Sequence, residues 1–291
     1  MIMTSILRST SDLPDLTGRT IVVTGSTSGI GRATARALSG ANARVVLAVR
    51  DTSKGKEIAA SFPAETIVRE LDLADLSSVR RFAETFDEPI HTLINNAGTS
   101  PSALQRTKDG FEMQFGTNHL GPFALTNLLL PLITGRVVSL SSQAERMAKI
   151  DFDDLNLMRT PYKEANVYAA SKLANLLFIA ELQRRLDRAG SSVTAVAAHP
   201  GLVATNMTGQ STGLMAVITR LFAQAPEDGA LPVLLAAIGE VPGGSFTGPE
   251  RFMHMRSGAE LIGRSRQAQD LAIAQQLWDA SEQLTEVVFP F

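Results

Sequence analysis

The feature that most constrains the fold is a regular alternation of short apolar runs with helical patterns. Residues 20–24, Thr-Ile-Val-Val-Thr, form a β-branched run of the kind buried in a parallel strand, and the run ends in a glycine-rich turn. A helical pattern follows at residues 32–38. Strand, turn and helix in this order predict the first unit of an α/β fold.

The same unit recurs along the chain. Further strands are expected at residues 44–49, 66–70, 91–94, 136–140, 193–198 and 244–247, and further helices at residues 54–62, 76–86, 111–130 and 267–284. No repeat, low-complexity segment or linker divides these units. The pattern predicts one domain at residues 1–291, a Rossmann-type doubly wound parallel sheet of about seven strands flanked by helices, with residues 1–17 as an N-terminal extension.

Composition excludes several classes of function. The 291 residues are 44% hydrophobic, enough for one large core or at most two modest ones. A net charge of −2 gives no reason to expect nucleic acid or an anionic membrane as partner. The absence of cysteine excludes disulfides and thiolate chemistry, and it favours a reducing, cytoplasmic setting. The longest nearly uncharged run, residues 121–135, is too short for a membrane span and is interrupted by Pro122 and Pro131, and residues 1–16 lack a signal-like apolar core.

A tyrosine and a lysine stand four residues apart in Tyr168-Ala-Ala-Ser-Lys172, so they share one face if the segment is helical. A free phenol has a pKa near ~10, and a fixed cation beside it favours phenolate and brings the group closer to acid–base work at neutral pH. An isolated pair of this kind is usually a surface feature of a helix. Its meaning depends on the motifs upstream.

Glycines follow the first expected strand at Gly25, Gly29 and Gly31. Glycines between a strand and a helix let the backbone approach a pyrophosphate, which the unpaired N–H groups of the helix start can bind. The alternative is an ordinary tight turn. Three residues separate the first two glycines, which departs from the common Gly-x-Gly-x-x-Gly spacing.

Together, five ordered motifs resemble the short-chain dehydrogenase/reductase family. They are Thr24-Gly-Ser-Thr-Ser-Gly-Ile-Gly31, Asn95-Asn-Ala-Gly98, Asn118, Ser142 and Tyr168-x-x-x-Lys172. The three-residue glycine gap is that family's own form of the motif, and the motifs cover residues 20–200. Further segments resemble the retinol-dehydrogenase-like and WW-domain-oxidoreductase-like members. These are Asp151-Phe-Asp-Asp-Leu-Asn156, Ser171-Lys-Leu-Ala-Asn175, His199-Pro-Gly201 and Leu277-Trp-Asp-Ala-Ser-Glu282.

The resemblance implies a hydride transfer between a nicotinamide cofactor and a carbonyl or alcohol. Tyr168 would exchange a proton with the substrate oxygen, and Lys172 would lower the pKa of the phenol and hold the nicotinamide ribose. Ser142 would hydrogen-bond the substrate oxygen, and Asn118 would kink its helix and bind a water of the proton relay. Ser142 is chosen over Ser141 because the family's catalytic serine is second in such a pair. Tyr162 has no lysine four residues on and is read as a loop or pocket residue.

The resemblance also implies which residues bind the cofactor. They are Gly25, Ser26, Thr27, Ser28, Gly29, Ile30, Gly31, Arg50, Asp72, Leu73, Asn95, Asn96, Ala97, Gly98, Tyr168, Lys172, Pro200, Gly201 and Val203. The backbone around Pro200, and not the imidazole of His199, is assigned to the nicotinamide.

The choice of dinucleotide rests on the end of the second strand. A free ribose is held by an acid there, and a 2′-phosphate needs a cation. The family's NAD-selecting acid is the last residue of that strand, here Val49, and Arg50 follows, so NADP is favoured while NAD stays open. Asp51 is the residue that favours NAD. Alternatively, Arg50 and Asp51 pair only with solvent or with each other.

The acidic cluster Asp151, Asp153 and Asp154 has no histidine nearby and is read as a solvated insertion, so no metal is expected. Residues 200–225 are expected to close over the substrate as a lid. An apolar set with helical spacing within them could cover a small lipophilic ligand, or pack on its own core or a second subunit. It comprises Met207, Leu214, Met215, Val217, Ile218, Leu221 and Phe222. The expected substrate is a small, lipophilic carbonyl or alcohol, such as an aldehyde, a ketone, or a retinoid- or steroid-like molecule.

The apolar tail at residues 287–291 is expected to dock on its own subunit or on a neighbour in a homodimer or homotetramer. The rival to an enzyme is a catalytically silent dinucleotide-binding sensor or scaffold protein. Such a protein would have no need of Tyr168, Lys172, Ser142 and Asn118 together.

Overall fold

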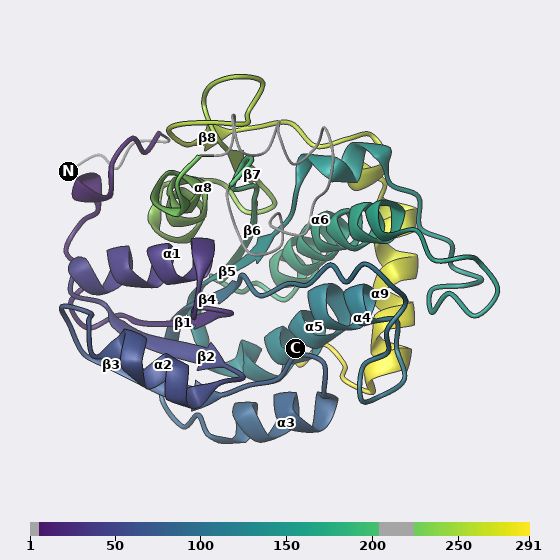
Figure 1. Ribbon diagram of the computed structural model, residues 1–291, viewed down its shortest axis with the longest axis horizontal. Helices are drawn as coiled ribbons and strands as arrows, with labels where there is room; N and C mark the ends of the chain where they lie inside the picture. Colours follow the sequence, from purple (N-terminus) through teal and green to yellow (C-terminus); the bar gives the residue numbers. More distant parts are fainter. Residues whose placement is uncertain (1–5, 204–223) are drawn as a thin grey trace.

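One mostly parallel sheet forms the centre of the computed structural model, which describes residues 6–203 and 224–291 (Figure 1). The strands are β1 (Thr20–Thr24), β2 (Arg44–Val49), β3 (Thr66–Glu70), β4 (Ile90–Asn95), β5 (Ile133–Leu140), β6 (Thr194–Ala198), β7 (Phe246–Gly248) and β8 (Glu260–Leu261). Their order in space is β3-β2-β1-β4-β5-β6-β7-β8. The order reverses between β1 and β4, which is where open α/β sheets bind ligands, at the carboxyl ends of the strands.

The described sheet has eight strands, so the expected count of about seven is corrected by one. The additional strand, β8, is two residues long and pairs antiparallel with β7, whereas the other neighbouring strands are parallel. A two-residue strand carries no periodicity that a sequence pattern could reveal.

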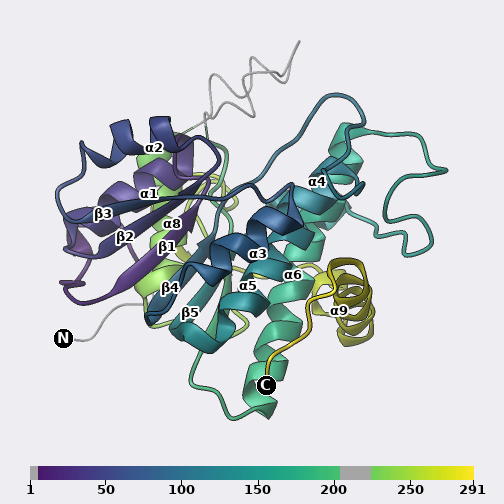
Figure 2. The same ribbon diagram turned by 90° about the horizontal axis from the view of Figure 1, so that it is seen from below.

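Helices cover both faces of the sheet. They are α1 (Gly29–Gly40), α2 (Thr52–Ala59), α3 (Leu76–Glu84), α4 (Met113–Phe115), α5 (Gly121–Leu129), α6 (Glu164–Arg188), α8 (Pro226–Ile238) and α9 (Leu271–Thr285). Buried residues of α1, α2 and α8 pack in one core cluster with one side of the strands. Those of α3, α5, α6 and α9 pack in another. Figure 2 shows α9 on the outside of α6.

The helix expected at residues 111–130 is not continuous. It is α4, then a π-helical turn at Gly116–Leu120, then α5 and a 3-10 turn at Leu130–Leu132. The turn is crowded: a Cβ on Gly116 would lie 2.4 Å from Cγ2 of Thr107, and one on Gly121 would lie 2.4 Å from the carbonyl oxygen of Leu73. Asn118 lies inside the π-helical turn. Such turns are frequent at functional sites.

The C-terminal region departs from the expectation in its helix, and its tail follows one of the two expected alternatives. The helix expected at residues 267–284 is a 3-10 turn at Gln267–Gln269 followed by α9, whose first residue, Leu271, is 62% exposed. The tail docks on its own chain, because the N–H of Phe289 donates to Oε1 of Glu282 (2.9 Å) and the Phe289 ring lies 6.0 Å from Trp278. Within residues 6–203 and 224–291, no helix is long and apolar enough to cross a bilayer.

Candidate active site

The Tyr168–Lys172 pair lies on α6, with Nζ of Lys172 5.5 Å from the centre of the Tyr168 ring. Lys172 is 5% exposed, and Nζ donates to the carbonyl oxygen of Leu140 at the end of β5 (3.3 Å). Burial lowers the pKa of Lys172 to about 8. The lysine is therefore a cation at neutral pH that loses its proton in mildly alkaline solution.

The pKa of the Tyr168 phenol is raised above its ordinary value. Burial is the larger cause, and a side-chain hydrogen bond with Ser142 acts in the opposite direction. The sequence led us to expect a net lowering by Lys172, and that expectation is wrong for this structure. Desolvation penalises the phenolate more than the hydrogen bond favours it, so the phenol holds its proton at neutral pH.

Ser142 follows β5 and begins the 3-10 turn Gln143–Met147, where its Oγ accepts from the N–H of Ala144 (3.3 Å). It is half-buried and faces the phenol of Tyr168. The neighbouring Ser141 is buried, and its Oγ donates to the carbonyl oxygen of Lys172 (2.7 Å). The structure thus places the second serine of the pair, and not the first, beside Tyr168.

Asn118 is 1% exposed and its side chain is held by three hydrogen bonds. Its Nδ2 donates to the carbonyl oxygen of Thr99 (3.0 Å) and to Oγ of Ser171 (3.1 Å), while its Oδ1 accepts from the N–H of Thr99 (2.7 Å). A Cβ on Gly98 would lie 3.2 Å from Oδ1 of Asn118 and 3.7 Å from Nζ of Lys172. Asn118 therefore ties the segment after β4 to α6 next to Tyr168 and Lys172.

The glycine turn after β1 is fitted against the segment after β4. Gly25 has φ +65°, and a Cβ there would lie 2.7 Å from Cα of Ala97. The amide of Asn96 donates to the carbonyl oxygens of Thr24 (2.8 Å) and Gly25 (3.2 Å). The contact with Ala97 leaves no room for a side chain at Gly25.

Thr24 is a site residue that the sequence reading did not single out. Its Oγ1 accepts from the N–H groups of both Asn96 and Ala97 at 3.0 Å. It therefore fixes the relative position of the two segments, and its place as the first residue of the glycine motif is the signal that could have identified it. Asn95 is buried at the end of β4, and its Nδ2 donates to Oγ1 of Thr126 on α5 (2.9 Å). This bond holds the start of the segment after β4 against α5.

The start of α1 fits the phosphates of a dinucleotide. The N-cap residue, Ser28, is extended and its side chain makes no hydrogen bond to the first turn, so those N–H groups are not capped by it. Ser26 is fully buried, and its Oγ has no hydrogen-bond partner in the structure. Gly29 and Gly31 lie in the first turn of α1, whereas the sequence placed the helix start at residue 32. Thr27 and Ile30 are half-buried around the turn.

Substituting Gly31 by alanine is expected to lower the affinity for the dinucleotide and to destabilise the fold. The new Cβ would lie 2.3 Å from Nδ2 of Asn96 and 2.6 Å from the carbonyl oxygen of Gly25, and overpacking of this kind costs about 1–3 kcal/mol. Urea unfolding and cofactor titration measure both effects. The control is Gly40→Ala at the other end of α1, where a Cβ meets nothing within 4 Å. Equal behaviour of the two variants would contradict the assignment.

The ends of β2 and β3 hold the residues expected around the adenosine. Arg50 is exposed directly after β2. Asp51 is committed elsewhere, because its Oδ1 accepts from the N–H of Lys54 (3.0 Å) and caps α2, which begins at Thr52 and not at residue 54. Asp72 is half-buried with its Oδ1 accepting from the N–H of Ala74 (2.9 Å), and Leu73 is buried.

The Pro200-Gly201 turn follows β6 at the same edge of the sheet. Gly201 has φ +78°, and a Cβ there would lie 2.5 Å from the carbonyl oxygen of Met255. His199 is 3% exposed, and burial lowers its pKa to about 3, so its ring is neutral. Val203 is buried and forms an isolated β-bridge with Gln224, the first described residue after residue 223. Most of the expected lid, residues 204–223, lies outside the described residues.

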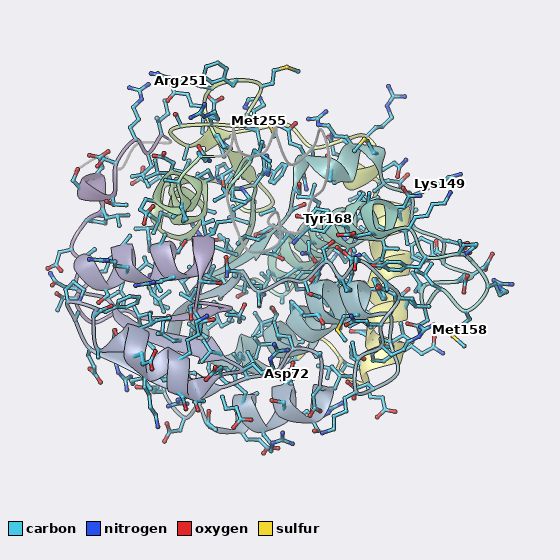
Figure 3. All side chains as sticks on the ribbon, in the orientation of Figure 1. Asp72, Lys149, Met158, Tyr168, Arg251 and Met255 are labelled. Atoms are coloured by element: carbon cyan, nitrogen blue, oxygen red, sulfur yellow. The ribbon has the colours of Figure 1, made fainter. Side chains whose placement is uncertain are left out.

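The acidic insertion is only partly solvated, which corrects its reading from the sequence. Asp154 is 6% exposed, and its carboxylate accepts from the N–H groups of Met158 (2.7 Å), Arg159 (3.2 Å) and Thr160 (2.8 Å). These bonds order the loop before α6, whereas Asp151 and Asp153 are exposed. Figure 3 labels Tyr168 near the middle of the molecule and Met158 on this loop at the edge.

A cavity of about 370 Å³ lies between the insertion, α4 and α6. Its α6 residues are Asn166, Val167, Ala170 and Ser171, and Oγ of Ser171 accepts from Nδ2 of Asn118 (3.1 Å), so the cavity borders the candidate site. Sequence reading did not anticipate it.

Known proteins match the chain over most of its length. A family model described as short chain dehydrogenase matches residues 19–213. Retinol dehydrogenase 14 of Homo sapiens is 40% identical over 309 residues, which cover 95% of this chain and 89% of that protein. Retinol dehydrogenase 12 of Mus musculus is 44% identical over 238 residues, covering 77% of this chain and 74% of that protein.

Solved structures agree with this result. The crystal structure of a protein from Mycobacterium paratuberculosis is 47% identical, with a TM-score of 0.87, and covers 98% of this chain and 100% of that chain. A short chain dehydrogenase/reductase family protein is 29% identical, with a TM-score of 0.60, over 80% of this chain and 95% of that chain. With the geometry above, these matches show that the chain belongs to the short-chain dehydrogenase/reductase family, among its retinol-dehydrogenase-like members, and is an oxidoreductase of alcohol or carbonyl groups that binds a nicotinamide dinucleotide.

Proposed function

We propose that the protein is an NADP(H)-preferring dehydrogenase/reductase that interconverts a lipophilic alcohol and its carbonyl, with Tyr168 as the general acid or base. The observation that carries the proposal is the meeting of Tyr168, Lys172 and Ser142 beside the glycine turn, at the reversal point of the sheet. The names of the retinol dehydrogenase relatives support a retinoid or another long apolar substrate.

The residues divide the chemistry as follows. A bound nicotinamide dinucleotide supplies or accepts the hydride. Tyr168 gives its proton to the carbonyl oxygen during reduction, and its raised pKa keeps that proton available at neutral pH. Ser142 hydrogen-bonds the substrate oxygen as charge develops on it. The ammonium of Lys172 lies over the Tyr168 ring and would hold the nicotinamide ribose, while Asn118 fixes the segment that carries Gly98 against α6.

Substrate turnover separates the proposal from its rival, a dinucleotide-binding sensor without chemistry. Purified protein would be mixed with NADPH or NADH and a panel of retinal, long-chain aldehydes, ketones, quinones and steroids. Oxidation of NADPH with one of these carbonyls supports the enzyme. Tight cofactor binding with no oxidation against the whole panel would favour the sensor.

The preference for NADP is proposed from Arg50 and Asp51. Arg50 is the exposed cation at the end of β2, and the carboxylate of Asp51 already caps α2. Replacing Arg50 by glutamine is expected to weaken NADPH binding about tenfold or more, because a charge-assisted hydrogen bond is worth roughly 1.5–3 kcal/mol. NADH binding, measured in the same variant by fluorescence titration, should change little. An equal loss for both cofactors would exclude Arg50 as a 2′-phosphate ligand.

The pH dependence of turnover is expected to report Lys172. Since burial lowers its pKa to about 8, the ammonium is present below that pH and is lost above it. The value of kcat/KM should therefore fall as pH rises through about 8. Lys172→Arg keeps a cation at all these pH values and should remove the inflection, at reduced activity. A flat wild-type profile between pH 7 and 9 would contradict the role given to the ammonium.

We also infer a cytoplasmic location from the absence of cysteine. We infer a homodimer or homotetramer because members of the family frequently form them. Light scattering coupled to size-exclusion chromatography measures the second. A mass of one chain, 31.1 kDa, would contradict it.

A further inference from the structure

Two large apolar side chains project from the loop between β7 and β8. Phe252 is 72% exposed and Met253 is 87% exposed. We call residues 251–256 the docking loop. Figure 1 shows the segment as a yellow-green loop at the upper edge of the molecule, and Figure 3 labels Arg251 and Met255 there. Single exposed apolar residues need no explanation, but two adjacent ones at the tip of a projection do.

The backbone of the docking loop is held in a rare conformation. Phe252, Met253 and His254 have φ values of +52°, +56° and +63°, in the left-handed region that residues other than glycine seldom enter. The turn is closed by hydrogen bonds from the N–H of Arg251 to the carbonyl oxygen of Arg256 (3.0 Å) and back (3.2 Å). The surrounding structure thus forces the two apolar side chains outward, and strain of this kind points to a function.

Both ends of the docking loop carry a cation, Arg251 and Arg256, and the loop itself contains no acid. Arg251 and Arg256 form no ion pair with any residue in the described ranges 6–203 and 224–291. Two acids flank the loop. The pKa of Glu250 is lowered mainly by its hydrogen bond with Arg8 (2.9 Å) and also by the charge of Arg251, and Glu260 lies 3.3 Å from Nδ1 of His254. The docking loop is therefore a basic projection on a chain whose net charge is −2.

The docking loop is tied to both sides of the proposed active site. Nε2 of Gln143, the residue after Ser142, donates to the carbonyl oxygen of Met253 (3.1 Å). On the other side, the N–H of Leu202, directly after the Pro200-Gly201 turn, donates to the carbonyl oxygen of Met255 (3.1 Å). The projecting tip therefore has a fixed position relative to Ser142 and the Pro200-Gly201 turn.

We propose that the docking loop inserts Phe252 and Met253 into an anionic lipid surface, with Arg251 and Arg256 at the headgroups, so that the active site faces the bilayer. Lipid fills in around a narrow apolar tip, whereas a specific protein interface needs about 800 Å² from each partner, far more than two side chains offer. Cations at the base match the negative potential of anionic lipids. A lipophilic substrate dissolved in the bilayer would then reach the site without crossing water.

Vesicle co-sedimentation tests the docking itself, without cofactor or substrate. Vesicles of phosphatidylcholine with phosphatidylserine, and of phosphatidylcholine alone, would be mixed with the full chain. The test variant is F252N/M253N, because asparagine tolerates the left-handed conformation and removes only the apolar groups. The control is M147N/M158N, which removes two methionines that are 83% and 75% exposed elsewhere.

We expect the wild type and the control to bind the anionic vesicles equally, and F252N/M253N to lose about tenfold or more in partition coefficient. R251Q/R256Q should lose about twentyfold on anionic vesicles at low salt, since each basic residue near such a surface contributes about a factor of five. Absence of wild-type binding, or an equal loss in both asparagine double variants, would overturn the proposal. Wild-type binding that is unaffected by F252N/M253N would show another attachment and would also overturn it.

Turnover gives a second readout, which rests on the proposed function. With a long-chain aldehyde held in vesicles, F252N/M253N should raise KM, while kcat/KM for a short water-soluble aldehyde stays at the wild-type value. If no carbonyl is reduced at all, the proposed function is wrong. The sedimentation result still decides whether the docking loop binds lipid, because that experiment uses neither cofactor nor substrate. A raised KM for both aldehydes would contradict a role in delivery from the bilayer.

Discussion

Replacing Tyr168 by phenylalanine is expected to lower kcat by about 10²–10⁴-fold, the usual contribution of a positioned general acid or base. The substitution removes one oxygen and keeps the ring packed on α6. The hydrogen bond with Ser142 is lost, and a phenyl ring has no proton to give. The affinity for NADPH should stay within about twofold, because the glycine turn and Arg50, which are proposed to bind the dinucleotide, are unchanged. Stopped-flow oxidation of NADPH and fluorescence titration measure the two quantities.

Tyr162→Phe is the matched control, since the chain has only two tyrosines. The Tyr162 hydroxyl accepts from Nε2 of Gln114 (2.8 Å) and donates to the carbonyl oxygen of Pro101. Losing these bonds costs about 1 kcal/mol of stability, with kcat unchanged. If Tyr168→Phe and Tyr162→Phe retained the same activity, the assignment of the general acid to Tyr168 would be wrong.

Replacing Trp278 by alanine is expected to lower the free energy of unfolding by about 3–5 kcal/mol. The side chain is 1% exposed, and its ring lies 4.9 Å from that of Phe123 and 5.8 Å from that of Phe178. The guanidinium of Arg185 lies 4.5 Å from the same ring, and Nε1 donates to Oε1 of Glu282 (2.8 Å). The variant therefore removes the contact that holds α9 on α6, and urea unfolding measures the cost.

Leu271→Ala is the control on the same helix. Leu271 is 62% exposed, so its removal should change the free energy of unfolding by less than about 0.5 kcal/mol. A Trp278→Ala variant as stable as Leu271→Ala would show that α9 is not part of the folded core. Because Phe289 also packs on Trp278, loss of the tail contact is expected in the same variant, visible as faster proteolysis after residue 285.

Much of the fold could be predicted because its signals are local. The strand at Thr20–Thr24 is buried throughout, and a β-branched run of that length between turn signals rarely forms anything but a strand. Likewise the glycine motif sits where a strand meets a helix, and its conformational demands act within a few residues. The crowding of Gly25 against Ala97 explains why the sequence has glycine there.

Other features depend on contacts far apart in sequence. The π-helical turn at Gly116–Leu120 depends on the packing of Gly116 against Thr107 and of Gly121 against Leu73, which no helical pattern shows. Helix α8 was not anticipated, because its apolar residues are buried all round and give no amphipathic period. It also contains Pro232, which usually argues against a helix.

The electrostatics of the site were the least predictable part. The spacing of Tyr168 and Lys172 correctly predicts that they are neighbours, yet the direction of the Tyr168 pKa depends on how deeply both are buried. Depth is a property of the whole fold. The same holds for Asp154, whose backbone partners lie four to six residues away along an irregular loop.

The most direct test of the central claim is the transfer of deuterium from NADPH labelled at C4. The protein would be incubated with the labelled cofactor and the panel of lipophilic carbonyls, and the masses of the products would be measured by mass spectrometry. We predict an alcohol that carries one deuterium on the former carbonyl carbon, formed by the wild type and almost absent with Tyr168→Phe. Tight cofactor binding with no labelled product from any carbonyl, or equal labelling by Tyr168→Phe, would contradict the account.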